Sequence, residues 1–260
     1  MTTHESAALI GYTGFVGGNL LAQRSFDARY NSSNIEEISG RSFDLIVCAG
    51  APAEKWKANA NPERDLVNIE RLAQSMSGAN ARHVVLLSTV DVFGYPIGVD
   101  EESLVPTEGL HAYGRNRRLL EELVAARFET TIVRLPGLYG PGLKKNVIFD
   151  FLHDNDVQKI DSRGVFQFYD TTRLWRDVET AMRHGLGLVH LPTEPVSIAD
   201  VARVSFGMQF TNEVLPTQAR YDVRTRHASL FGGSGWYIES ATETLDGIAA
   251  YIQRERARPS

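Results

Sequence analysis

The sequence predicts an α/β fold, with a doubly wound parallel sheet in its N-terminal half and a smaller C-terminal α/β lobe. Two observations lead to this prediction. Up to about residue 134, short apolar runs alternate with longer stretches of helical spacing, which is the pattern of βαβ units. After Pro136, closely spaced glycines and prolines break that regularity. We therefore expect one domain over residues 1–136 and a second over residues 137–260.

In the N-terminal half, strands and helices are expected to alternate along the chain. Apolar and β-branched runs predict strands over 7–12, near 30–31, and over 43–49, 83–88 and 130–134. Helical spacing of apolar residues predicts helices from the end of a glycine-rich turn to about residue 25, over 62–76 and over 112–127. Pro62 suits a first helical turn, because the amide hydrogen that it lacks would have no intrahelical acceptor there.

The second half is more mixed. Gly137, Gly140, Pro141 and Gly142 mark a loop at its start. Helical spacing then predicts helices over 147–153, 173–184, 198–206 and 241–254. A strand is expected over 188–191, so the lobe combines both kinds of element.

Composition and charge indicate a small partner in a reducing compartment. The formal net charge of -5 disfavours a broad cationic surface for nucleic acid or an anionic membrane. Cys48 is the single cysteine, so no intrachain disulfide can form, and the seven histidines show no metal-ligand spacing. The first residues lack a secretory pattern, and no apolar run reaches the roughly 18 residues that span a bilayer. We expect a soluble, cytoplasmic protein without a metal.

A glycine-rich turn between the first strand and the first helix is the strongest local signal. Gly11, Gly14 and Gly17 recur at every third position. In dinucleotide-binding turns, such glycines allow a tight turn, a close approach of backbone to pyrophosphate and close helix packing, while the helix N-terminus favours the anion. The position predicts a nicotinamide dinucleotide on a Rossmann-type domain; an ordinary strand-to-helix turn is the alternative.

The GxxGxxG spacing resembles the extended short-chain dehydrogenase/reductase family, of the nucleotide-sugar-modifying NAD-dependent epimerase/dehydratase type. The resemblance continues through 86–94, 112–117, 134–142, 194–201 and 222–232, nearly to the end of the chain. It implies that the C-terminal lobe mainly binds substrate. It also implies a set of cofactor contacts: Gly11, Thr13, Gly14, Phe15, Val16 and Gly17 in the turn, and Ala49, Gly50 and Ala51 after the third strand.

The choice between NAD and NADP depends on the end of the second strand. In NAD enzymes, a carboxylate about 20 residues beyond the glycines usually holds the adenosine ribose. Here Asn31, Ser32 and Ser33 offer neutral hydrogen-bonding groups that would not repel a 2′-phosphate. These residues favour NADP over NAD; a polar turn without a coenzyme contact is the alternative.

The resemblance also implies the catalytic residues. In 86–94, Thr89 takes the place of the hydroxyl that holds the reacting oxygen of the substrate, with Ser88 as the alternative. Tyr113 takes the place of the acid/base that exchanges a proton with that oxygen. Asn68 falls where the family carries a structural asparagine, and a solvated helix residue is the alternative.

Arg117 departs from the family pattern, because a lysine is expected four residues after Tyr113. Arginine keeps the positive charge and can donate to the ribose of the coenzyme, but its planar fork differs in shape from an ammonium group. Two interpretations follow. Tyr113 and Arg117 support hydride exchange at a sugar carbon, or the chain is a dinucleotide-binding regulatory subunit with impaired catalysis.

The resemblance implies a nucleotide-activated sugar as substrate, in carbonyl reduction or epimerisation that supplies surface-polysaccharide precursors. Lys144, Lys145 and Asn146 resemble a segment that contacts the nucleotide diphosphate, although two solvated lysines are the alternative.

Two further expectations come from the same resemblance. Dehydration is disfavoured, because Val90 and Asp91 stand where dehydratases carry an acidic pair. The apolar helix over 112–128 predicts a homodimer, since members of the family pair through that region.

Overall fold

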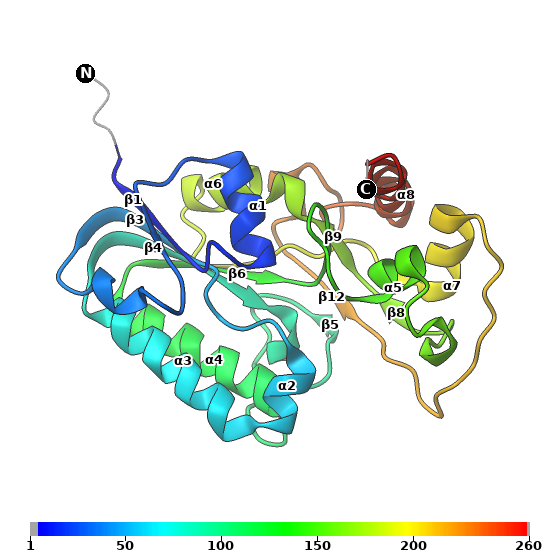
Figure 1. The fold of residues 1–260 in the computed structure, drawn as a ribbon, viewed down its shortest axis with the longest axis horizontal. Helices are drawn as coiled ribbons and strands as arrows, with labels where there is room; N and C mark the ends of the chain where they lie inside the picture. The colour runs from blue at the N-terminus through cyan, green and yellow to red at the C-terminus, as the bar shows by residue number, and fades with distance from the viewer. Residues whose placement is uncertain (1–4, 259–260) are drawn as a thin grey trace. The chain divides into compact units, whose positions relative to one another are not determined.

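The computed structural model describes residues 5–258, which form two compact units (Figure 1). The first unit contains the described residues up to Tyr95, together with Ser103–Leu135 and Arg173–Val189. The second contains Pro96–Glu102, Pro136–Thr172 and the described residues from His190 onward. The break after Leu135 lies beside the expected boundary, but 96–102 and 173–189 belong to the opposite units from those expected. Residues 1–4 and 259–260 of the expected domains lie outside the described residues.

The first unit is built on a six-stranded sheet with the order β10-β6-β4-β3-β1-β2. The pairs β1–β2, β1–β3, β3–β4 and β4–β6 are parallel. The strands are β1 (Ala7–Ile10), β2 (Ala28–Tyr30), β3 (Ser42–Cys48), β4 (Asn80–Thr89), β6 (Thr130–Leu135) and β10 (Leu188–His190). This topology confirms the predicted Rossmann-type α/β fold.

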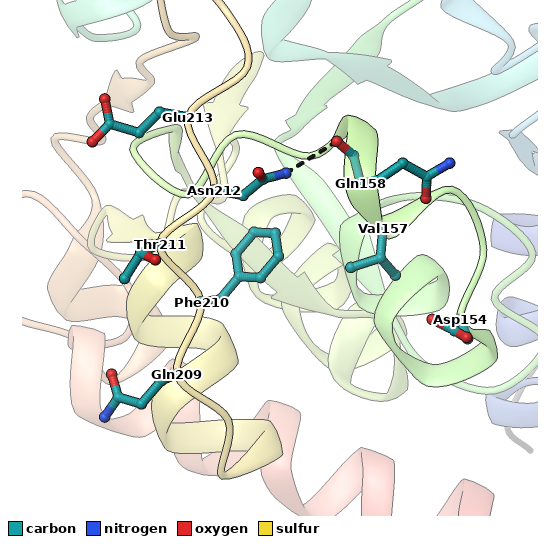
Figure 2. Close-up of a pocket in the computed structure, with 8 residues that line it drawn as sticks. All are labelled: Asp154, Val157, Gln158, Gln209, Phe210, Thr211, Asn212 and Glu213. Carbon is teal, nitrogen blue, oxygen red and sulfur yellow. Dashed lines mark hydrogen bonds between the residues drawn. The ribbon is translucent and has the colours of Figure 1, made fainter.

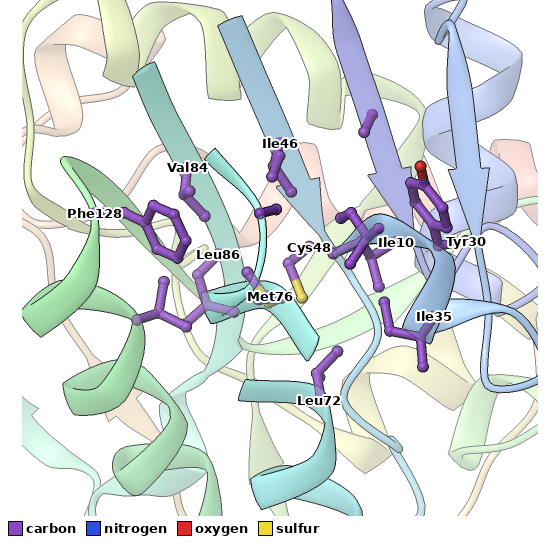
Figure 3. Packing of buried hydrophobic residues seen from close by; sticks show 14 of the residues in the cluster. Ile10, Tyr30, Ile35, Ile46, Cys48, Leu72, Met76, Val84, Leu86 and Phe128 are labelled. Carbon is purple, nitrogen blue, oxygen red and sulfur yellow. The ribbon is translucent and has the colours of Figure 1, made fainter. Parts of the chain in front are cut away.

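Helices cover both faces of this sheet (Figure 1). α3 (Pro62–Ser77) and α4 (Ala112–Arg127) pack side by side on one face, and α1 (Phe15–Gln23) and α6 (Leu174–Arg183) lie on the other. Strands buried on both faces read as continuous apolar runs, as the fully buried Ala7–Ile10 shows. Between β1, β3, β4 and α3, the side chains of Ile10, Ile46, Leu86 and Met76 form the core (Figure 3).

The second unit contains short strands in three pairs. β7 (Gly137–Tyr139) is parallel to β9 (Phe168–Asp170), β5 (Ile97–Val99) is parallel to β12 (Asp222–Val223), and β8 (Val165–Phe166) is antiparallel to β11 (Val196–Ser197). Its helices are α5 (Val147–His153), α7 (Ile198–Asp200) and α8 (Ala241–Arg256). The predicted helix over 198–206 is α7 followed by a π-helical turn that ends at Ser205.

Some elements were not predicted because they are short. α2 (Lys55–Ala60) has 6 residues, and the paired strands of the second unit have 2 or 3 each. Short 3-10 helices lie at Ile35–Ile38, Val90–Val92, Val157–Lys159, Thr171–Arg173 and Ala228–Phe231. Across residues 5–258, no helix is both long enough and apolar enough to cross a membrane.

Candidate functional site

The glycine turn is shaped mainly by contacts within the protein itself. Gly11 has φ +85°, and a Cβ added there would collide with the carbonyl oxygen of Ala49. A Cβ added at Gly17 would collide with the carbonyl oxygen of Gly11. Two of the three glycines are therefore required for the ends of β1 and β3 and the start of α1 to approach one another.

Gly14 is different, because its surroundings leave room. It is exposed, and an added Cβ would meet only the carbonyl oxygen of Gly11, at 3.3 Å. Gly14 is also the N-cap of α1, and among residues 5–258 no side chain caps that helix. The first amide groups of α1 therefore remain directed at the open side of the turn, which fits a bound pyrophosphate. Thr13 is exposed beside it, and Phe15 and Val16 are half-buried.

Ala49, Gly50 and Ala51 follow β3 and are all half-buried. The amide of Ala49 donates to the carbonyl of Ile10 at 2.9 Å, which ties this segment to the glycine turn. A side chain at Gly50 would press against Ile10, at 2.9 Å, and against Leu72. The predicted cofactor contacts from β1 and β3 thus lie next to each other in one unit.

The residues after β2 form a hydrogen-bonded polar turn. The Oδ1 atom of Asn31 accepts from the amide of Ser33 at 2.9 Å and from its hydroxyl at 2.6 Å. The Nδ2 atom of Asn31 donates to the Tyr12 hydroxyl at 3.3 Å, which links this turn to the glycine turn. Ser32 and Ser33 are exposed. The turn is thus ordered by its own bonds and still presents hydroxyl groups outward.

Tyr113 and Thr89 come together at the carboxyl end of β4. Tyr113 lies in the first turn of α4, is 8% exposed, and its amide donates to Oδ1 of Asn59 at 3.0 Å. His111 caps this helix, because its Nδ1 accepts from the amide of Gly114 at 3.0 Å. The Thr89 hydroxyl accepts from the amide of Asp91 at 3.1 Å, and it lies close enough to Tyr113 to lower the pKa of the Tyr113 hydroxyl.

Burial raises the pKa of Tyr113 to about 12, because a buried phenolate loses its hydration. The charge of Arg117 and the nearby Thr89 hydroxyl lower this pKa in part. The carboxylates of Asp91 and Asp65 raise it further. Tyr113 is therefore protonated at neutral pH in the absence of ligands.

Ser88 points away from this pair into a buried polar network. Its hydroxyl donates to Oε1 of Glu121 at 2.5 Å. Glu121 is also held by Arg134, whose Nε and Nη2 donate at 2.9 and 2.7 Å, and both of these side chains are at most 1% exposed. Of the two hydroxyl groups predicted for catalysis, the structure brings only Thr89 to Tyr113.

Arg117 lies beneath the ring of Tyr113 and is only 3% exposed. The centre of its guanidinium group is 4.1 Å from the ring centroid, a cation–π distance. Its Nη1 donates to Oδ2 of Asp65, and its Nη2 donates to the carbonyl oxygen of Pro52. Its Nε is buried without an acceptor among residues 5–258. Both terminal nitrogens of Arg117 are thus bound by the protein itself.

Asp65 is a site residue that sequence reasoning missed. It lies on α3, is 6% exposed, and its Oδ2 also accepts from Nδ2 of Asn116 at 2.8 Å. Asn68, the residue predicted from this helix, is exposed instead. A signal was present, because Asp65 shares the buried stripe of α3 with Ile69, Leu72 and Met76, where an unpaired carboxylate would be costly.

Two further charged residues lie beside the Tyr113 group. Lys55, at the start of the unpredicted helix α2, donates to Oδ1 of Asp91 at 2.8 Å. Burial lowers the pKa of His111, and the charge of Lys55 lowers it further. The site thus contains both signs of charge close to Thr89, whose hydroxyl accepts from the amide of Asp91.

The predicted substrate contacts belong to the second unit. Lys144 and Lys145 are exposed. Asn146 has φ 112° and caps α5, because its Oδ1 accepts from the amides of Ile148 and Phe149. Its Nδ2 donates to the carbonyl of Leu138 at 2.8 Å, so the amide of Asn146 is engaged within the protein.

A surface hollow also lies in the second unit (Figure 2). Asn212 bridges across it, since its Nδ2 donates to the carbonyl of Gln158 at 3.0 Å. None of the predicted site residues lines this hollow. Among residues 5–258, no group of three or more histidine, cysteine or acidic side chains could hold a metal ion.

Solved structures show the same fold over almost the whole chain. MoeE5 in complex with UDP-glucuronic acid and NAD is 17% identical, with 96% of this chain and 99% of that chain covered and a TM-score of 0.71. For RMD from Pseudomonas aeruginosa complexed with NADPH, the identity is 16%, the coverage 96% and 99%, and the TM-score 0.71. For a dTDP-4-dehydrorhamnose reductase from Clostridium acetobutylicum, these values are 17%, 96%, 99% and 0.73.

The family comparison is more specific. A comparison with curated proteins gave no match. The model of the NAD dependent epimerase/dehydratase family matches residues 24–179, which include Thr89, Tyr113 and Arg117 but not the glycine turn. This match confirms the predicted family, and because it spans more than half of the sequence, the chain belongs to the NAD dependent epimerase/dehydratase family.

Proposed function

We propose that this protein is an NAD(P)-dependent oxidoreductase or epimerase that acts on a nucleotide-activated sugar. The observation that carries the proposal is the proximity of the Thr89 and Tyr113 hydroxyl groups at the carboxyl end of β4. It lies in the same unit as a glycine turn whose open side fits a pyrophosphate. Ligands of open α/β sheets bind outside the carboxyl ends of the strands, which is where both features lie.

Each residue of the pair has a distinct role in this proposal. A bound nicotinamide supplies hydride exchange at the reacting carbon. Thr89 donates to the oxygen on that carbon, and Tyr113 exchanges the proton of the same oxygen. Ser88 has no part in the chemistry in this proposal, because its hydroxyl donates a hydrogen bond to Glu121.

The coenzyme preference remains part of the proposal. The hydroxyls of Ser32 and Ser33 are exposed beside Asn31, which supports a neutral cradle for a 2′-phosphate and favours NADP. Relatives in fold carry NAD in one case and NADPH in another, so both coenzymes belong in the test.

The substrate class rests on the family and on similar structures, one of which binds UDP-glucuronic acid. We propose a nucleotide sugar for this chain, contacted by the exposed Lys144 and Lys145 and used to make surface-polysaccharide precursors in the cytoplasm. The contact by Asn146 is less well supported, because its amide caps α5.

A regulatory subunit is the second candidate, and Arg117 is the observation that favours it. Both of its terminal nitrogens are bound by Asp65 and Pro52, and little of the side chain remains exposed to hold a ribose. A chain of this kind would bind the coenzyme without turnover.

Calorimetric titration with NADPH and with NADH, alone and then with a panel of nucleotide sugars, separates these candidates. Coenzyme binding followed by a sugar-dependent conversion supports the enzyme, and binding without conversion supports the subunit. Tyr113→Phe should abolish conversion while leaving coenzyme affinity within about tenfold. Tyr95→Phe, at an exposed tyrosine of the same unit, is the matched control and should change neither. Absence of binding by both coenzymes would overturn the proposal.

A further inference from the structure

We propose that Asp65 is a positioning residue of this site: it holds the Arg117 guanidinium against the face of Tyr113 and offsets part of the effect of that charge on the Tyr113 hydroxyl, which serves as a proton donor. The catalytic part of this inference rests on the proposed function. Its structural part concerns three side chains of one unit and can be tested without any ligand.

Two hydrogen bonds fix the guanidinium group of Arg117 from two sides. Asp65 on α3 accepts from one terminal nitrogen, and the carbonyl of Pro52 accepts from the other. The guanidinium group then lies 4.1 Å from the centre of the Tyr113 ring rather than beside its hydroxyl. A lysine would have to reach both acceptors from a single nitrogen, because an ammonium group has no planar fork with two terminal nitrogens.

The carboxylate of Asp65 is itself fixed by a second hydrogen bond. Nδ2 of Asn116, the residue beside Arg117 on α4, donates to the same carboxylate oxygen at 2.8 Å. Asp65 and Arg117 are 6% and 3% exposed, so their charges attract each other with little screening by water. Removal of one partner would leave a buried charge without a counter-charge, and its electrostatic effect on Tyr113 would no longer be offset.

Tyr113 is surrounded by charged and titratable groups of both signs. Arg117 is the cation nearest to the ring and lowers the pKa of Tyr113, and Asp65, which holds it, offsets part of this effect. Asp91, which is paired with Lys55, raises the same pKa. His111 at the start of α4 accepts a hydrogen bond at Nδ1, and burial holds its pKa below the ordinary value.

Because the carboxylates offset part of the effect of Arg117, burial dominates and the phenol is favoured over the phenolate. A protonated Tyr113 suits reduction of a carbonyl group. Its O–H bond breaks and an O–H bond forms on the substrate oxygen, whose carbon gains the hydride of a reduced nicotinamide. Solvent then returns a proton to the tyrosinate. The opposite direction would start with tyrosinate as the base, so the protonated form of Tyr113 is the one that begins a reduction.

The test is a spectroscopic pH titration of tyrosinate absorbance in the protein without ligands, with Tyr113→Phe subtracted to isolate Tyr113. In the unchanged protein, Tyr113 should ionise only near the alkaline end of the titration. In Asp65→Asn, unpaired Arg117 should lower the pKa of Tyr113 by about 1 or more. Glu63→Gln, at an exposed acid in the first turn of the same helix, is the matched control and should leave it unchanged. An unchanged pKa in Asp65→Asn would overturn the inference.

The double variant Asp65→Asn with Arg117→Gln removes both charges and keeps the test decisive if the single variant does not fold. Replacement of a buried ion pair by neutral groups costs far less stability than loss of one partner. Because the pair is already neutral as a whole, the double variant should keep the pKa of Tyr113 near that of the unchanged protein. A rise of about 1 or more would show that Arg117 acts as an uncompensated cation, which contradicts the inference.

Discussion

Single residues of the glycine turn have separable roles. At Gly17, a side chain would collide with backbone inside the protein, whereas at Gly14 it would project toward the open side of the turn. Glycine is therefore needed at position 17 for folding, whereas at position 14 it allows a ligand to approach the turn.

Alanine substitutions should separate these two roles. Gly17→Ala should lower the midpoint of thermal unfolding strongly or prevent folding, because backbone of the turn must move. Gly14→Ala should fold with a midpoint within a few degrees of the unchanged protein and lose at least tenfold in coenzyme affinity. Thermal unfolding and calorimetric titration of both variants provide the measurements. Equal coenzyme affinity in Gly14→Ala would contradict a pyrophosphate at this position.

At this scale, the sequence predicted the residues that carry a motif. Thr89 and Tyr113 were found because strand-end and helix-start patterns mark them. Asp65 carries no motif, and its role depends on α3 and α4 packing side by side, which a single sequence does not report. The sequence also does not report that the Ser88 hydroxyl donates to Glu121 or that Asn68 is exposed, since the direction of a side chain depends on its neighbours from other elements.

Among the elements, α4 is bound to the sheet by a polar network as well as by apolar packing. Glu121 accepts from Ser88 on β4 and from Arg134 on β6, which are directly paired in the sheet. Arg118 on α4 adds a further contact at 3.1 Å. The orientation of the helix that carries Tyr113 therefore depends on a buried carboxylate.

Glu121→Gln should lower the free energy of unfolding by about 3–5 kcal/mol, because Arg134 would keep a buried charge without its partner. Glu122→Gln is the matched control, since Glu122 is half-exposed and pairs with Arg118 on the surface. That change should cost less than about 1 kcal/mol. Urea unfolding of the two variants measures both effects. Equal losses would mean that the buried network does not anchor α4.

The predicted bounds of helices and strands agree best with the structure for the longer elements. α4 and α5 have the predicted bounds, and the six strands of the first unit lie within a few residues of the predicted ones. α2 and the paired strands of the second unit were missed, because 2 to 6 residues give too little periodicity. Their positions depend on tertiary pairing.

For the whole molecule, the oligomeric state remains a prediction that the first unit supports. Val67 on α3 and Leu123 on α4 are 61% and 42% exposed, whereas apolar residues such as Ile69 and Leu120 of the same helices are buried. We expect a second copy of the chain to cover this face in a homodimer. Leu123→Glu should shift the mass in light scattering from dimer to monomer. Leu104→Glu, at an exposed leucine outside the helices, should leave the mass unchanged. A monomeric unchanged protein would refute the dimer.

The route of the chain between the two units has a consequence for how the protein folds. Residues 173–189 return to the first unit, where α6 packs on α1 and β10 adds a strand beside β6. A nascent chain that has emerged only to residue 136 therefore has an unpaired β6 edge, and the face of the sheet that carries α1 still lacks α6. Such surfaces favour aggregation and chaperone capture. The dinucleotide-binding unit is thus completed late in synthesis, and a gene fragment cut at residue 136 would not encode it.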